Sequence, residues 1–124
     1  MASYANSLKS ARMQAIIAAI DGNIEAAFME IGNAGVATVA VTITLDSPSF
    51  TEANGTITMS GMPKSGHAIV PGTLVEARIR DGGGNIIVSG LTVGLSNADI
   101  ILDFVDLIVD QTVTISYAAI THSP

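Results

Sequence analysis

The segment Val39-Ala40-Val41-Thr42-Ile43-Thr44-Leu45 indicates the fold class of this 124-residue chain. Its odd-numbered positions are apolar, whereas Thr42 and Thr44 are polar. Because successive side chains of a β-strand point to opposite faces of a sheet, this alternation predicts a strand with one buried face and one wet face. The same alternation returns near the C-terminus, in the segment Thr112 to Tyr117. The chain is therefore expected to be mainly β.

From residue 23 to the C-terminus, short runs rich in β-branched residues are separated by Gly, Pro, Asn and Asp. This pattern is typical of strands joined by turns. Roughly seven strands in about 100 residues fit an antiparallel β-sandwich or a jelly roll better than a closed barrel. The predicted strands are Ala26–Ile31, Val36–Leu45, Thr56–Ser60, Thr73–Arg80, Asn85–Val93, Ile100–Phe104 and Thr112–Ala119.

Glycine and proline positions predict how these strands connect. The run Arg80 to Asn85 contains three glycines, which supply the positive φ values that a tight hairpin requires. A phosphate-binding loop is the alternative, but such loops precede a helix, and here a strand follows. Pro48 to Asn54 and Gly61 to Gly66 are expected to be longer, irregular loops, and Pro71-Gly72 a tight turn.

Residues 7 to 21 have a different pattern, which is typical of an amphipathic helix. Good helix formers, mostly alanine, fill the positions between apolar residues. Ser7 or Asn6 is expected to cap the start of the helix, and Gly22 to close its end. We therefore expect an N-terminal arm and helix (1–22) and a β-sandwich (23–124), together one structural domain. The apolar stripe of the helix consists of Leu8, Met13, Ile16, Ile17 and Ile20.

Charge and cysteine content argue against several functional classes. Eleven acids against five bases give a net charge of −6, which removes the attraction for phosphate backbones and anionic lipids. Neither nucleic acid nor a membrane is an expected partner. With no cysteine, the chain has no disulfide and no thiolate nucleophile. No signal peptide is expected, because the first seven residues lack a basic region and the apolar run Ala15 to Ile20 is short. No transmembrane segment is expected, because the longest apolar run near the C-terminus, Ile100 to Val109, falls short of the roughly 20 residues that span a bilayer.

The shortage of charge predicts a covered surface. Only 13% of the residues are charged, against about 25% in an average soluble domain. Since a small domain keeps many of its residues at the surface, part of that surface is expected to lie against another subunit. A soluble monomer coated in Thr, Ser, Asn and Gly is the alternative. The candidate partner interface is the apolar stripe of the helix, which must pack on its own sandwich or on a neighbour, together with Arg78 and Arg80, which share a strand face.

No group of residues predicts catalysis or a bound cofactor. Four carboxylates near the C-terminus are spaced by four, three and four residues, unlike the alternate-residue oxygen ligands of a calcium loop. We interpret them as solvated strand edges and turns, with a calcium site as the alternative. His67 and His122 lack a nucleophile in a recognisable setting and are expected to be exposed. No catalytic, cofactor-binding or metal-binding residue is predicted, so an enzyme is not expected. The four carboxylates are Asp99, Asp103, Asp106 and Asp110.

Several short motifs follow one another along most of the chain, and they are structural rather than catalytic. They are Ala11-Arg12-Met13-Gln14-Ala15-Ile16, Glu30-Ile31-Gly32, Leu45-Asp46-Ser47-Pro48-Ser49-Phe50, Gly72-Thr73, Ala77-Arg78-Ile79-Arg80-Asp81, Gly90-Leu91-Thr92-Val93-Gly94, Ala98-Asp99-Ile100 and Gln111-Thr112-Val113-Thr114-Ile115. Their order resembles a family of small virion proteins of tailed bacteriophages. The chain departs from the family pattern at Ala77, where an aromatic residue is typical, and at Gly32, where a tyrosine is typical.

The resemblance implies a β-sandwich component of the virion, made in the cytoplasm of the bacterial host. A capsid decoration or cement protein on the capsid exterior is the first expectation, with the major capsid protein or other virion proteins as partners. It would form a homo-oligomer, with a trimer favoured. The alternative is a structural or receptor-binding β-module of the tail or baseplate. That alternative suffers from the few aromatic residues, since sugar-binding sites usually expose ring faces.

Overall fold

The computed structural model of the chain describes residues 5–22, 25–46 and 48–121. Within them, one helix, α1 (Asn6–Asp21), precedes a set of short strands and a single 3-10 turn, η1 (Ala34–Val36). The expected class, mainly β with one N-terminal helix, is confirmed. The strands are β1 (Phe28–Gly32), β2 (Val39–Thr44), β3 (Phe50–Ala53), β4 (Thr56–Met59), β5 (Lys64–His67), β6 (Gly72–Thr73), β7 (Glu76–Arg80), β8 (Ile86–Gly94), β9 (Ile100–Leu102), β10 (Asp106–Leu107) and β11 (Thr112–Thr121).

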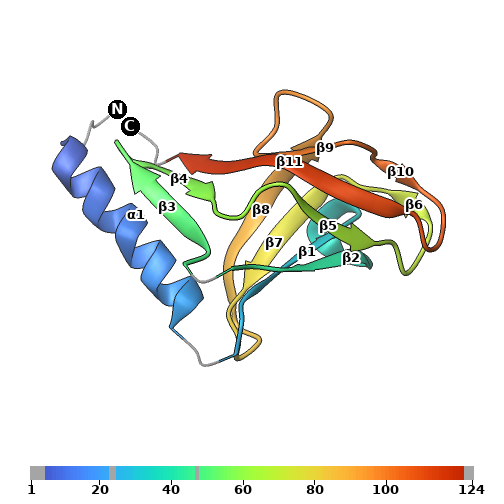
Figure 1. The fold of residues 1–124 in the computed structure, drawn as a ribbon, viewed down its shortest axis with the longest axis horizontal. Coiled ribbons are helices and arrows are strands. Elements are labelled where there is room, and N and C mark those ends of the chain that lie inside the picture. The colour runs from blue at the N-terminus through green and yellow to red at the C-terminus, as the bar shows by residue number, and fades with distance from the viewer. Residues whose placement is uncertain (1–4, 23–24, 47, 122–124) are drawn as a thin grey trace.

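Nine of these strands form one continuous sheet that curls over on itself (Figure 1). Its order is β2-β1-β7-β8-β9-β11-β4-β3, with β5 paired to β11, and only β8 and β9 run parallel. The Ile69 amide donates a hydrogen bond to the Ala40 carbonyl over 2.8 Å, which ties the chain beyond β5 to β2 at the other end of the sheet. The curled sheet therefore has two facing layers, as in a sandwich, and β6 and β10 pair separately at one end of the molecule.

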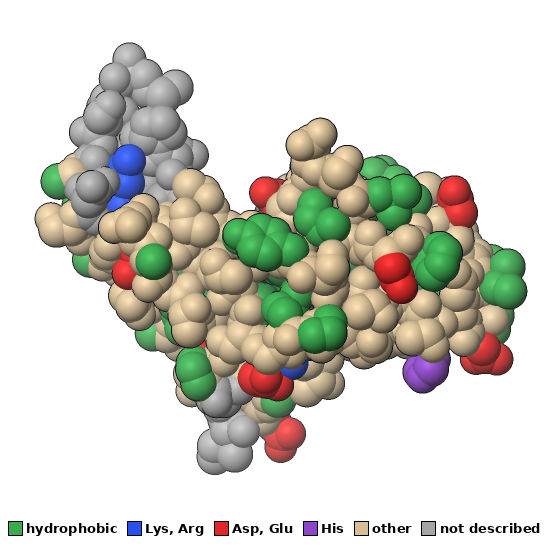
Figure 2. All heavy atoms as spheres, turned by 45° about the horizontal axis from the view of Figure 1, so that its top comes forward, with side chains coloured by type: hydrophobic (Ala, Val, Ile, Leu, Met, Phe, Trp, Pro, Cys, Tyr) green, Lys and Arg blue, Asp and Glu red, His purple; other side chains and the backbone are tan. Residues whose placement is uncertain are grey.

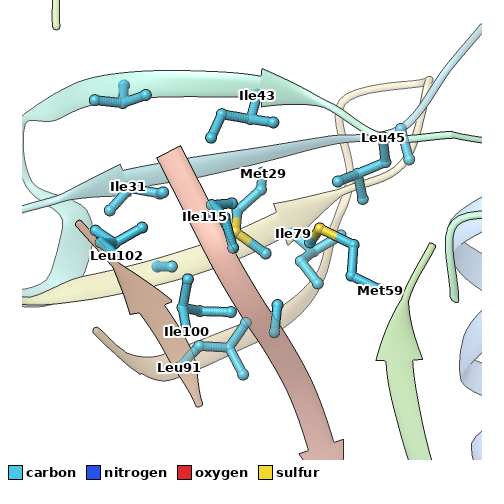
Figure 3. Packing of buried hydrophobic residues seen from close by; sticks show 14 of the residues in the cluster. Met29, Ile31, Ile43, Leu45, Met59, Ile79, Leu91, Ile100, Leu102 and Ile115 are labelled. Carbon is cyan, nitrogen blue, oxygen red and sulfur yellow. The ribbon is translucent and has the colours of Figure 1, made fainter. Parts of the chain in front are cut away.

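The space between the layers is filled by one apolar core. Figure 3 looks through this core, with β11 crossing in front of β1 and β7. Met29 and Ile31 project inward from β1 and Ile115 from β11, and none of the three is exposed to solvent. β2 shows the alternation predicted from the sequence: Val41 and Ile43 are buried in the core, whereas Thr42 and Thr44 are exposed on the other face.

The predicted hairpin between β7 and β8 is confirmed, and a buried carboxylate holds its turn. Asp81 Oδ1 accepts hydrogen bonds from the backbone amides of Gly83 (3.0 Å) and Asn85 (2.9 Å). The bond from the Asn85 amide is the main reason that the pKa of Asp81 lies below its ordinary value, since it outweighs the opposing effect of burial. The glycines thus serve a turn that the side chain of Asp81 organises.

Two segments predicted to be irregular loops contain strands instead. β3 lies within Pro48 to Asn54, and β3 and β4 form a hairpin whose turn residues, Asn54 and Gly55, have φ values of 52° and 82°. Asn-Gly is a strong signal for such a turn, because both residues tolerate positive φ. β5 overlaps the second predicted loop and extends one residue beyond it, and its Lys-Ser-Gly-His sequence has no apolar alternation that would reveal a strand.

The helix begins one residue earlier than predicted, and its expected N-cap is wrong. Ala5 occupies the capping position, and its carbonyl accepts the amides of Leu8 and Lys9 at 3.0 Å, with no side-chain cap. Ser7 lies inside the first turn and so cannot cap it. In the part of the chain described, no helix has the length and apolar character needed to cross a bilayer.

We predict that Gly32→Ala destabilises the fold by about 1–3 kcal/mol, the usual cost of overpacking. Gly32 lies where the register between β1 and β2 shifts, and a Cβ there would overlap the Thr38 carbonyl oxygen. Gly94→Ala is the matched control, because its nearest contact would be an ordinary 3.4 Å from the Ser96 carbonyl oxygen. Urea unfolding of both variants measures the difference. Equal midpoints for the two variants would contradict this account of Gly32.

Candidate interaction surface

The helix packs on its own chain. Met13, Ile17 and Ile20 are buried in the core, and Ile16 packs against it from a partly buried position. Of the two alternatives left open by the sequence, the structure adopts packing on the sandwich rather than on a neighbour. These four residues are therefore not surface contacts for another subunit. Only Leu8 of the predicted stripe is well exposed, at 44%.

Polar contacts fix α1 against the β3–β4 hairpin (Figure 1). Ser10 Oγ donates to Glu52 Oε2 over 2.9 Å, and the same oxygen accepts the Gly55 amide over 2.8 Å. At the other end of the helix, the Ser49 amide donates to Asp21 Oδ2 over 3.0 Å. Gly55 also lets the hairpin approach closely, because a Cβ there would lie 3.0 Å from the Lys9 Cβ. The helix is thus part of the domain and not a separate arm.

Arg78 and Arg80 converge on Glu30 of the neighbouring strand. The Nε atoms of both arginines lie 2.7 Å from Glu30 Oε1, and Arg80 Nη1 also donates to the Gly84 carbonyl over 2.6 Å. Burial raises the pKa of Glu30, but the hydrogen bonds from Arg80 and Arg78 outweigh it, so this pKa lies below its ordinary value. The two predicted interface arginines therefore form ion pairs within their own chain.

The four C-terminal carboxylates do not converge. Asp99 Oδ2 accepts the Thr92 amide, Asp103 Oδ1 accepts the Thr114 amide, and Asp106 Oδ1 accepts the Thr73 hydroxyl. Asp110 has a φ of 68°, as is common in turns. Among the described residues, no three Asp, Glu or His side chains come close enough to hold a metal ion.

Of the two histidines, only His67 lies among the described residues. His67 is exposed, as predicted, and its Nδ1 lies 3.2 Å from the Thr112 hydroxyl oxygen. The second histidine, His122, lies outside the described residues.

Several exposed apolar side chains lie at the end of the molecule opposite α1, although Ile86, Leu95 and Tyr117 are exposed elsewhere. We call residues 68–75 and 103–111 the β6–β10 end. Hydrogen bonds between Ala68 and the 110–111 backbone (2.8 and 2.9 Å) bring Ile69 next to the turn that holds Ile108. Ile69 is 65% exposed and Ile108 71% exposed, and Phe104 is 52% exposed. The remaining members of this apolar group are Val75 and Val109.

A pocket of about 380 Å³ lies beside this apolar group. One wall comes from Asn33 and Thr38, which flank η1, and from Ala40 of β2, and the other from the 70–75 segment. Asn33, Thr38 and Thr73 contribute polar groups. Figure 2 shows hydrophobic side chains standing among acidic ones and a histidine at this end, with no Lys or Arg visible there. The β6–β10 end is therefore the candidate interaction surface.

Sequence reasoning predicted an apolar surface but placed it on the helix. The sequence does contain a signal for the β6–β10 end, the apolar pair Ile108-Val109. This pair follows β10 and precedes Asp110 in a turn, where no strand face requires apolar residues. Ile69 gives the same signal, because it directly follows buried Ala68 outside any strand.

We predict that Glu30→Gln lowers the melting temperature by a few degrees at neutral pH, and that this difference shrinks as the solution is acidified. Because the pKa of Glu30 is lowered by folding, its ion pairs stabilise the protein above the ordinary glutamate pKa, and this contribution is lost as pH falls through the lowered value. Glu25→Gln, at an exposed position, is the control and should melt like the wild type. Melting curves from pH 7 to about pH 3 test this; a constant offset for Glu30→Gln would contradict it.

Comparisons with known proteins give the chain no relative. No family model, no curated protein and no solved structure matches it. What can be proposed about function therefore rests on the β6–β10 end, the charge distribution and the resemblance noted in the sequence.

Proposed function

We propose that this chain is a structural subunit of a tailed-phage virion, a capsid decoration or cement protein that stabilises the head shell by binding the major capsid protein on its exterior. The resemblance of its motifs to small virion proteins suggests the setting. The observation that carries the proposal is the apolar group at the β6–β10 end, whose largest members, Ile69 and Ile108, are mostly exposed. A group of this kind marks a surface that another protein covers.

The energetics suit a repetitive shell. Burying apolar surface contributes roughly 25 cal/mol per Å², so one small contact adds little by itself. A shell repeats the same contact at every equivalent position, so many weak contacts together oppose its expansion or disassembly. A homo-oligomer, with a trimer favoured, would present several copies of the β6–β10 end at once and would bind more tightly than one copy.

The chemistry of the surface fits a binding role better than turnover. The hydrogen bonds that Asp99, Asp103 and Asp106 accept hold loops and strand ends in place. The imidazole of His67 has one hydrogen-bonding partner among the described residues, the hydroxyl of Thr112. These groups stabilise the fold, and no nucleophile, base and orienting group meet among them as catalysis requires. A binding role is therefore proposed rather than turnover of a substrate.

A tail- or baseplate-associated module with a receptor-binding role is the second candidate. The feature that favours it is the pocket beside the apolar group, because its polar groups Asn33, Thr38 and Thr73 could orient a small ligand. Copy number separates the two candidates. A shell component is expected in hundreds of copies per particle and a tail-tip component in a handful, because the head and the tail have different symmetries.

We predict that the purified chain binds heads assembled without it and raises the temperature at which they disrupt. Ile108→Asp should weaken this binding roughly tenfold or more, because a charge would replace an apolar contact. Ile86→Asp is the matched control: Ile86 is 49% exposed but begins β8, at the turn whose Gly82 packs against the backbone after α1. Co-sedimentation gives the affinities. If the wild-type chain does not bind heads, or if both variants lose the same amount of affinity, this role for the β6–β10 end is excluded.

A further inference from the structure

The charged residues at the β6–β10 end are all acidic. Residues 68–75 and 103–111 contain three acidic residues and no Lys or Arg. These acids are Asp103, Asp106 and Asp110, and all three are exposed. A surface that combines exposed apolar side chains with a rim of carboxylates selects partners by charge as well as by shape, because like charges across an interface are strongly disfavoured.

Two of the three carboxylates hold no backbone group in place. Asp103 Oδ1 accepts the Thr114 amide, which fixes this carboxylate against β11. Asp106 uses one oxygen, Oδ1, for the Thr73 hydroxyl. Within the described residues, no hydrogen bond or ion pair occupies the Asp110 carboxylate, which sits in the turn between Ile108 and β11. Asp106 and Asp110 therefore form the part of the rim that can meet cations outside the chain.

A second copy of the chain is a poor occupant of this end. A symmetric contact between two β6–β10 ends would place the acidic rims of both copies together, and their repulsion would oppose it. Lys64 lies 2.7 Å from Asp46 and both strand arginines bind Glu30, so these three cations are paired within the chain. Lys9 and Arg12 lie on α1, at the far end of the molecule.

Resting on the function proposed above, we infer that the β6–β10 end docks on a different virion protein whose contact surface presents Lys and Arg side chains around an apolar patch. The apolar groups of the two proteins form the centre of the contact, and the basic groups meet Asp106 and Asp110 at its rim. Rim charges act mainly on the rate of association and on its salt dependence. This inference concerns the chemistry of the partner, which the apolar group alone does not specify.

The test uses the full chain and heads assembled without it, with binding measured by co-sedimentation at about 50 mM and about 500 mM NaCl. Two single variants, Asp110→Asn and Asp106→Asn, keep the local structure: asparagine tolerates the φ of 68° at position 110, and its carbonyl can still accept the Thr73 hydroxyl at position 106. Glu25→Gln removes the same single charge from an exposed position between α1 and β1 and serves as control.

At low salt, the double variant Asp106→Asn/Asp110→Asn should bind roughly three- to tenfold more weakly than the wild type, as expected for two rim ion pairs. High salt should weaken the wild type and leave the double variant nearly unchanged, whereas Glu25→Gln should behave as the wild type. If the wild type binds heads but neither salt nor the double substitution matters, the basic partner is excluded and the decoration role stands. Failure of the wild type to bind heads overturns both. Light scattering of the free chain adds one more outcome: self-association that the double variant abolishes would make the occupant a second copy and overturn the inference.

Discussion

The fold depends on β11, the longest strand in the described chain. It pairs with β5 through its first half, with β9 through its middle and with β4 through its last residues. One strand thus joins three others that come from different parts of the sequence. Its inward side chains, Val113, Ile115 and Ala118, are fully buried and lie against the layer formed by β1 and β7. Without this strand the sheet could not curl, and the apolar faces of both layers would meet water.

Much of this was predictable because burial imposes strict alternation. The two clearest alternating segments form β2 and β11, which lie in opposite layers and bury their apolar faces in the core between them. The glycine-rich hairpin between β7 and β8 was also predictable, because positive φ is available to few other residues. β3 and the turn after it were predictable in principle from Asn54-Gly55. β5 was not, because its hydrogen bonds to β11 are made by the backbone and leave no pattern in Lys64 to His67.

An exposed apolar surface could be predicted from the sequence, but its place in the fold could not. Composition indicated too little charge for an exposed surface, and the helix offered the most obvious apolar stripe. In the folded chain that stripe belongs to the core, because α1 packs against β3, β4 and β8. The exposed apolar side chains come instead from turns, where neither period 2 nor period 3.6 applies. The pairing of Arg78 and Arg80 with Glu30 was likewise hidden, since it depends on which strand lies beside β7.

The β6–β10 end carries acidic charge without a Lys or Arg, whereas the helix end carries cations alongside acids such as Asp21 and Glu52. The acidic rim lies at the β6–β10 end, whereas Lys9 and Arg12 lie on the helix at the other. In the field of a positively charged surface, a chain of this kind turns its acidic end forward before contact. Productive encounters then become more frequent without any increase in the strength of the final contact. Orientation would thus be settled during diffusion, which favours a uniform pose when many copies attach in succession.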